Sequence, residues 1–312
     1  LNTRVLLSIR EAGAIGYVGI IDDAILFPSP IGQGRYTSLI MNLVGFLSIP
    51  FIFVFFKEVF RRTLQGPSEI IEEGINQQII GVAALAEEDE DNITASFSGI
   101  ATNILFNLKD EGSGSIIMIS GPSPLVGKSY VSRQLAKYYA SIGKKTILLD
   151  LDLRKGKQHE EFDVNNSIGL TQILRQESTL DPVKVSDNLS LLTTGKKQKD
   201  PGALFQSSTL TNLMNSLKEK YELIIFDTAP VLAVSDALML TQFIDMNLHV
   251  VRHDQTQLEE LSESLEIFKK IKKDVDGLIY NGYVEHKTLY GYKYNYRYGG
   301  YKYYQNYYET ED

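Results

Sequence analysis

One stretch, residues 115–129, constrains the fold of this chain more than any other. It begins with an apolar, isoleucine-rich run, passes through a turn rich in glycine and proline, and closes on Gly-Lys-Ser. Residues 134–140 then have helical character. A strand, a loop and a helix in this order are the context of a phosphate-binding loop, because backbone N–H groups and the positive end of the helix dipole favour an anion there.

The glycine spacing of this loop departs from the strict pattern G-x-x-x-x-G-K-[ST]. Its first glycine would fall where the chain has Pro122, and Gly121 lies one residue too early. The match therefore rests on Gly127, Lys128 and Ser129, and an ordinary turn stays the alternative for the loop taken alone. In a nucleotide site, Lys128 would reach the β- and γ-phosphates and the Ser129 hydroxyl would ligate Mg²⁺.

Acidic residues end two further apolar runs. Asp150, Asp152 and Arg154 follow the first run, and Asp227 closes the second. In an open parallel sheet, ligands bind at the carboxyl ends of the strands. We therefore expect the loop and both acidic strand ends to converge on one Mg²⁺-nucleotide site. Unrelated aspartate-rich turns are the alternative, and they would have to coincide at three places.

The Gly-Lys-Ser loop, the Asp-x-Asp-x-Arg run at 150–154 and the Asp-Thr-Ala-Pro run at 227–230 resemble the Walker A, A′ and B motifs of bacterial tyrosine kinases. These are the BY-kinases of capsule and exopolysaccharide export. The ParA/MinD-like ATPases, their relatives in fold, carry a signature lysine that would fall at Ser123, so the kinase branch is favoured. The alternation of strands and helices predicts an α/β fold with a doubly wound, mostly parallel sheet of P-loop NTPase type.

The resemblance implies roles for individual residues, with ATP and Mg²⁺ as cofactors. Ser129, Asp152 and Asp227 would hold the metal, while Lys128 and the loop hold the phosphates. Asp150 would accept the tyrosine proton, although Asp150 and Asp152 could exchange roles, and Arg154 would stabilise the transferring charge or orient a neighbouring subunit. The expected nucleotide contacts are Gly121, Ser123, Val126, Gly127, Lys128, Ser129 and Tyr130, with Arg252 near the base.

Residues 36–56 carry no charge and are long enough to cross a bilayer as a helix, which takes about 20 residues. A buried core helix is the alternative. Lys57, Arg61 and Arg62 follow at once, and this excess of positive charge predicts that the C-terminal side is cytoplasmic. We therefore expect a protein of the bacterial inner membrane with a cytoplasmic kinase domain. Because the chain opens on Leu1, we expect it to be part of a longer protein.

The predicted domain organisation follows from these features and from the resemblance. It comprises the end of a periplasmic chain-length-determinant domain at 1–35, a transmembrane helix at 36–56, a juxtamembrane linker at 57–95, the kinase domain at 96–285 and a disordered tail at 286–312. Between the membrane and the kinase core, residues 67–79 and 98–108 are expected to be helical. The acidic run at 87–91 is expected to be a solvated loop.

The tail contains ten tyrosines and almost no aliphatic residue that could pack a core, so we expect it to be disordered. An edge strand or an adhesive aromatic tail is the alternative. The resemblance implies that these tyrosines are the phosphoacceptors that neighbouring copies phosphorylate. They are Tyr290, Tyr292, Tyr294, Tyr296, Tyr298, Tyr301, Tyr303, Tyr304, Tyr307 and Tyr308.

The resemblance also implies partners: neighbouring copies of the chain, the polysaccharide polymerisation and export machinery, and a cognate tyrosine phosphatase. BY-kinases usually carry Glu-x-x-Arg-x-x-Arg on a helix that makes ring contacts, and Ala95, Ser98 and Ala101 stand at those positions here. The net charge of −8 does not indicate a nucleic-acid partner, and a chain without cysteine forms no disulfide.

The function predicted from the sequence is an ATP-dependent protein-tyrosine autokinase that phosphorylates its own tail in trans and regulates capsule or exopolysaccharide production. Two alternatives remain open at this point. One is a membrane-tethered ATPase of the ParA/MinD type, and the other is a nucleotide-dependent assembly scaffold without kinase activity. Phosphotyrosine in the tail would distinguish the kinase from both.

Overall fold

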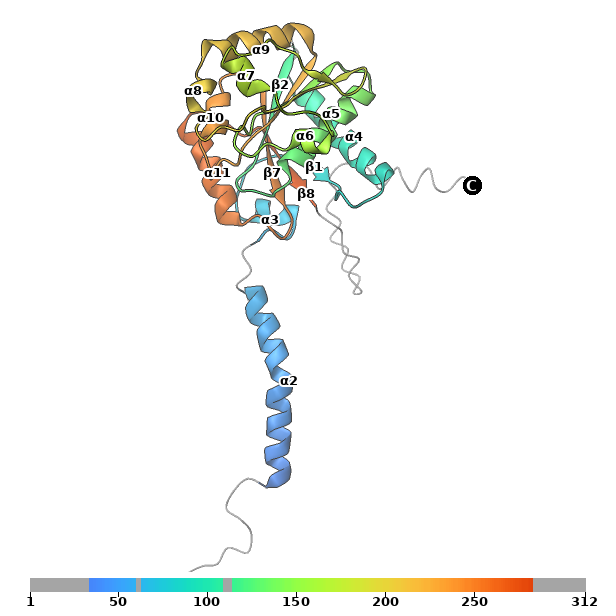
Figure 1. The fold of residues 1–312 in the computed structure, drawn as a ribbon. Coiled ribbons are helices and arrows are strands. Elements are labelled where there is room, and N and C mark those ends of the chain that lie inside the picture. The colour runs from blue at the N-terminus through green and yellow to red at the C-terminus, as the bar shows by residue number, and fades with distance from the viewer. Residues whose placement is uncertain (1–33, 60–62, 109–113, 283–312) are drawn as a thin grey trace, which may run out of the picture. The chain divides into compact units, whose positions relative to one another are not determined.

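The computed structural model describes residues 34–59, 63–108 and 114–282 (Figure 1). The chain divides into two compact units, Leu1–Arg61 and Arg62–Asp312, each considered by itself. The predictions for the periplasmic segment, for Arg61 and Arg62 and for the tyrosine-rich tail lie outside the described residues.

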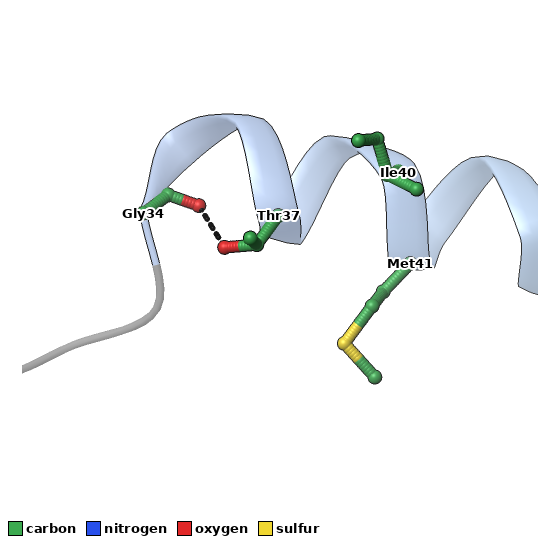
Figure 2. Close-up of a pocket in the computed structure, with 4 residues that line it drawn as sticks. All are labelled: Gly34, Thr37, Ile40 and Met41. Carbon is green, nitrogen blue, oxygen red and sulfur yellow. Dashed lines mark hydrogen bonds between the residues drawn. The ribbon is translucent and has the colours of Figure 1, made fainter.

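The first unit contains a single long helix, α2 (Arg35–Val59), within its described part. Its segment Tyr36–Phe56 has a mean hydropathy of 2.4 and is not buried among the described residues, so the predicted helix of membrane-spanning length is confirmed. The Thr37 hydroxyl donates to the Gly34 carbonyl oxygen at 2.6 Å, beside the apolar side chains of Ile40 and Met41 (Figure 2). Such internal bonding satisfies hydroxyl groups where the surroundings offer no partner.

The second unit is built on one eight-stranded sheet within the described residues, in the order β1-β8-β7-β2-β6-β3-β5-β4. Every neighbouring pair is parallel except β4 and β5. The predicted doubly wound, mostly parallel sheet is confirmed. The strands are β1 (Ile79–Ala83), β2 (Ser115–Ser120), β3 (Thr146–Asp150), β4 (Val183–Lys184), β5 (Leu189–Leu192), β6 (Leu223–Asp227), β7 (Met246–Arg252) and β8 (Gly277–Asn281).

Helices cover both faces of this sheet (Figure 1). On one face, α4 (Glu90–Asn107) and α5 (Lys128–Ser141) pack over Ile117 and Ile119. On the other face, α9 (Ser208–Lys220) and α11 (Leu258–Lys270) belong to the core that contains Ile116 and Met118. Alternate residues of β2 thus enter opposite cores, which explains why a strand buried on both faces appears in the sequence as an unbroken apolar run. The shorter helices are α3 (Pro67–Glu72), α6 (Gln158–Glu161), α7 (Leu170–Leu174), α8 (Gly202–Phe205) and α10 (Asp236–Leu240).

Two local predictions before the core are wrong. The helix expected at 67–79 ends at Glu72, and the edge strand β1 follows, so the sheet includes residues that the sequence assigns to the linker. Helix α4 begins inside the expected acidic loop. There the Asp89 side chain accepts a hydrogen bond from the Asn92 N–H at 2.8 Å, so part of the acidic run caps a helix whose positive dipole end favours carboxylates.

Candidate nucleotide-binding site

The loop between β2 and α5 takes its shape from one glycine. Gly127 caps α5 with a φ of 98°, in the left-handed region that favours glycine. A Cβ atom at this position would lie 2.0 Å from Asn281 Nδ2, which donates to the Val126 carbonyl oxygen at 2.9 Å. Asn281, at the end of β8, therefore holds the loop in place. No sequence motif pointed to it, because it lies about 150 residues away along the chain.

Lys128 occupies the centre of the loop and is only 6% exposed. Its Nζ donates to the Ser123 carbonyl oxygen at 3.1 Å across the loop. Burial lowers the pKa of Lys128 to about 8, although attraction to Asp227 and Asp152 opposes that effect. A bound polyanion would favour the ammonium form, so the side chain suits the phosphate-binding role that the sequence predicts.

Two carboxylates are brought together by strand register. Asp150 and Asp227 are paired residues at the ends of β3 and β6, and they are 0% and 1% exposed. Burial, with repulsion from Asp227, raises the pKa of Asp150 well above its ordinary value. Burial also raises the pKa of Asp227 to about 6, against the lowering effect of the hydrogen bond from Gln158 and of the nearby Ser129 hydroxyl. These two groups form the acidic side of the site.

The two candidate proton acceptors occupy different environments. Asp150 is closed off by the following turn, since a Cβ atom on Gly156 would lie 2.3 Å from Asp150 Oδ1. Asp152 is half-buried, and its Oδ1 accepts hydrogen bonds from the N–H groups of Arg154 at 3.2 Å and Lys155 at 2.9 Å. Asp152 is thus the more accessible carboxylate, and Asp150 is the one whose pKa burial raises.

Arg154 is engaged within its own chain. Its Nε and Nη2 donate to Asp236 Oδ2 and Oδ1 at 2.6 and 3.2 Å, and its Nη1 donates to the Lys199 carbonyl oxygen. Asp236, at the start of α10, is 4% exposed. The guanidinium therefore joins the strand end of β3 to α10 and to the loop after β5. This partner was not foreseen, because nothing in the sequence connects the two residues.

The other predicted nucleotide contacts lie on or beside the loop, with one exception. The Ser123 hydroxyl donates to Glu260 Oε2 on α11 at 3.0 Å, and Arg252 Nη1 donates to the Leu125 carbonyl oxygen at 3.0 Å. Val126 is buried beneath the loop. The Tyr130 hydroxyl donates instead to the Ala84 carbonyl oxygen at 3.2 Å, after β1.

Gln158 is a further residue that the sequence did not reveal. It is fully buried, and its main-chain N–H donates to Asp150 Oδ2 at 3.0 Å. Its side-chain Nε2 donates to Asp227 Oδ2 at 2.8 Å and to the Ser129 carbonyl oxygen at 2.9 Å. One glutamine thus contacts all three motifs of the site. A glutamine following a basic turn carries no recognisable signal in a single sequence.

The acidic side of the site fits a magnesium ion bound together with phosphates. Asp227 Oδ1 and Asp150 Oδ1 are buried and have no hydrogen-bond partner among the described residues. Over that same part of the chain, no group of three or more acidic, histidine or cysteine side chains could hold a metal unaided. Mg²⁺ typically uses one or two carboxylates, substrate phosphates and water, so Ser129, Asp152 and Asp227 form a suitable donor set.

Comparisons with known proteins show which families this chain resembles. The family model described as "AAA domain" matches residues 114–279. The relatives include the tyrosine-protein kinase ptk of Acinetobacter johnsonii, which is 31% identical over 90% of this chain and 41% of that protein. They also include a putative tyrosine-protein kinase in the cps region of Klebsiella pneumoniae, 29% identical over 92% of this chain and 44% of that protein. This chain spans less than half the length of these relatives. The predicted resemblance to bacterial tyrosine kinases is confirmed.

Solved structures support the fold. The chimerical protein CapA2B2 is 29% identical, with a TM-score of 0.62 over 68% of this chain and 97% of that one. The kinase domain of Escherichia coli tyrosine kinase ETK is 24% identical, with a TM-score of 0.66 over 74% of this chain and 100% of that one. The loop, the sheet order and these matches describe a P-loop fold of the nucleotide-binding kind.

Proposed function

We propose that this chain, which belongs to the AAA domain family, is the membrane-anchored kinase part of a bacterial protein-tyrosine autokinase. It uses ATP and Mg²⁺ to phosphorylate the tyrosines between 290 and 308 on neighbouring copies. One observation carries the proposal: the buried lysine of the loop after β2 lies within electrostatic reach of the buried Asp227, which is paired with the buried Asp150, in a chain that also bears ten clustered tyrosines. The names of the relatives support the same activity.

The loop and Lys128 bind and orient the phosphates of ATP, because positioning and charge neutralisation supply most of the catalysis in phosphoryl transfer. Ser129, Asp152 and Asp227 would hold Mg²⁺, which when bound neutralises negative charge on the β- and γ-phosphates. The phenolic oxygen of a tail tyrosine forms a bond to the γ-phosphorus, and the bond from that phosphorus to the bridging oxygen of ADP breaks. The phenolic proton passes to a carboxylate of the enzyme, and ADP leaves.

Asp150 is the proposed proton acceptor. Its raised pKa brings it closer to that of the phenol, which favours proton transfer to it. Its burial requires the turn over Gly156 to move when the tyrosine arrives. Asp152 is the alternative acceptor, since it is already accessible. Separate Asp150→Asn and Asp152→Asn variants distinguish the two roles. Loss of the proton acceptor changes the pH dependence of kcat, whereas loss of the metal ligand raises the Mg²⁺ concentration needed for half-maximal activity.

We place the kinase domain on the cytoplasmic side of a bacterial inner membrane, anchored by α2, whose apolar and otherwise unpacked surface suits lipid. The proposed partners are other copies of the chain, the polysaccharide export machinery and a tyrosine phosphatase. The relative from the Klebsiella pneumoniae cps region supports the polysaccharide context. Each tyrosine phosphate adds roughly −1.5 to −2 charges at pH 7, so phosphorylation should loosen self-association of this acidic chain.

The test is the intact mass of the purified chain before and after phosphatase treatment, and again after addition of ATP and Mg²⁺. A ladder of added phosphates that maps to residues 290–308 is the expected result. ATP hydrolysis without the ladder would replace the kinase by the tethered ATPase. Nucleotide binding with neither hydrolysis nor the ladder would favour the assembly scaffold.

A further inference from the structure

The turn after Arg154 folds back over the strand end of β3 and places Gln158 in the centre of the site. Gly156 makes this close approach possible, since any side chain there would collide with both oxygens of Asp150 and with Thr194. Gln158 is 0% exposed, and its main-chain N–H donates to Asp150 Oδ2. This contact depends on the backbone and not on the glutamine side chain.

The side chain of Gln158 makes a second, independent set of contacts. Its two strong acceptors, the Ser129 carbonyl oxygen and Asp227 Oδ2, both require a donor, which assigns the side-chain nitrogen rather than the oxygen to that side. Both amide hydrogens are thereby used. Ser132 Oγ lies at the longer distance of 3.3 Å. The amide therefore ties the carboxylate of β6 to the first turn of α5.

These contacts leave one oxygen free on each carboxylate. Oδ2 of Asp150 and Oδ2 of Asp227 are both bound by Gln158, whereas Oδ1 of each is buried without a partner among the described residues. The side-chain oxygen of Gln158 is a third buried acceptor of this kind. Buried polar atoms without partners are rare in folded proteins, so the free Oδ1 of Asp227 is an acceptor that remains available to a donor or a cation.

We propose that Gln158 is a positioning residue that links Asp227 to the phosphate-binding helix and directs the free Oδ1 of Asp227 toward the metal. The inference rests on the proposed function only in assigning Asp227 to the nucleotide-bound metal. Groups that orient a metal-binding side chain without touching the metal typically change metal affinity or activity by about 10- to 100-fold when removed. Gln158 contacts a carboxylate and a loop carbonyl, which is how such a group acts.

The test compares Gln158→Met with Gln172→Met in the full chain in detergent. Methionine keeps the length of the side chain and fills the space, but it removes the amide and leaves the main-chain bond to Asp150 intact. Gln172 is a matched control, because it is also buried at 5% exposure and its Oε1 accepts hydrogen bonds only from the main chain, from the N–H groups of Gly169 and Lys196. ADP affinity is measured by calorimetry with Mg²⁺ and with EDTA, and folding by thermal unfolding without nucleotide.

Mg²⁺ should increase the ADP affinity of Gln158→Met by a factor about 10-fold smaller than in the wild type. The ADP affinity measured in EDTA should be nearly the same in the two proteins. In Gln172→Met the gain in ADP affinity on adding Mg²⁺ should equal the wild-type gain. An unchanged gain in a folded Gln158→Met would overturn the proposal. If Gln158→Met does not fold, the smaller Gln158→Leu replaces it, since leucine also lacks the amide and adds no charge, and the same criterion applies. Because ADP binding needs no phosphotyrosine, a chain that binds Mg²⁺·ADP normally but never phosphorylates its tail refutes the kinase and not this inference.

Discussion

The nucleotide site has a loop side, formed by the loop between β2 and α5, and an acidic side, formed by Asp150 and Asp227. The two sides differ in whether their polar groups have hydrogen-bond partners. On the loop side, the Lys128 ammonium, the Ser123 hydroxyl and the Val126 carbonyl all have hydrogen-bond partners within the chain. On the acidic side, Asp150 and Asp227 are buried together, their pKa values are raised, and each has an oxygen without a partner in the described part of the chain. The loop is thus stable before nucleotide binds, whereas the acidic side is stabilised only when a cation or a proton arrives.

The largest expected effect comes from removing Lys128, the buried cation of the loop side. Lys128→Met should abolish tail phosphorylation, a loss of at least about 100-fold, because the buried ammonium is the group that neutralises the phosphates. Phosphotyrosine is measured on the purified variant after addition of ATP and Mg²⁺. Lys137→Met is the control, because Lys137 lies exposed on the same helix and its Nζ lies over the ring of Phe162, 5.5 Å from the ring centroid. Phosphotyrosine formation by pure Lys128→Met would contradict the assignment.

A smaller but still large effect should follow from distorting the loop itself. Gly127→Ala should cost about 3 kcal/mol of unfolding free energy, because alanine is strained at positive φ and its Cβ would collide with Asn281. Gly143→Ala is the matched control: its φ is 86°, but no atom lies within 4 Å of the added Cβ. Only the conformational cost of about 1–2 kcal/mol is expected there. Equal losses in the two variants, measured by denaturant unfolding, would mean that Asn281 does not constrain the loop.

The burial of two carboxylates on the acidic side should make the stability of the chain depend on pH. The pKa of Asp227 is raised from 3.8 to about 6, so the native state binds more protons than the unfolded state between these values. The contribution of Asp227 to the stability of the nucleotide-free chain should therefore increase as the pH falls from 7.5 to 5 and decrease as the pH rises through about 6. Asp150 should act in the same direction, since its pKa is also raised. The buried His249, whose pKa is lowered to about 3, acts in the opposite direction over this range, so comparison with a variant isolates the contribution of Asp227.

The Asp227→Asn variant measures how much of this pH dependence comes from Asp227. It removes the buried charge but keeps an oxygen that can accept from Gln158, so it should stabilise the nucleotide-free chain relative to the wild type by about 1 kcal/mol at pH 7.5, and this difference should disappear towards pH 5. Tail phosphorylation should be lost. Thermal unfolding of the wild type and of Asp227→Asn across the pH range measures the difference between them, and a difference that stays constant from pH 7.5 to 5 would show that burial does not destabilise the charged form of Asp227.

The smallest expected effect comes from removing the hydrogen bond between Ser123 in the loop and Glu260 on α11. Ser123→Ala removes the hydrogen bond to Glu260 and should lower the unfolding free energy by about 1 kcal/mol, with tail phosphorylation retained. Ser141→Ala is the control, because its hydroxyl makes only a local bond to the Tyr138 carbonyl oxygen at the end of α5. If Ser123→Ala abolished ADP binding, the loop side would depend on α11 far more than the contacts suggest.

Local sequence was sufficient wherever one segment fixes its own structure. The strand, loop and helix around Lys128 and the apolar runs that end in Asp150 and Asp227 were predicted, because hydrophobic patterning and turn residues act over a few positions. It failed at β1, an edge strand that forms only against β8, and at the start of α4, where an acidic run is also a helix cap. The strand β1 depends on what the segment packs against, whereas the start of α4 is a local cap that the acidic run concealed.

The sequence by itself determined that this chain has a membrane-length helix, a P-loop fold and three motifs at strand ends. Tertiary structure alone decided that Asp150 is closed off while Asp152 is open, that Arg154 pairs with Asp236, and that Gln158 joins all three motifs. The physical reason is that burial and hydrogen bonding are set by neighbours far away along the chain, 82 residues for Arg154 and Asp236 and 155 residues for Val126 and Asn281. Residue type supplies the chemistry of each group, and packing decides which groups can use it.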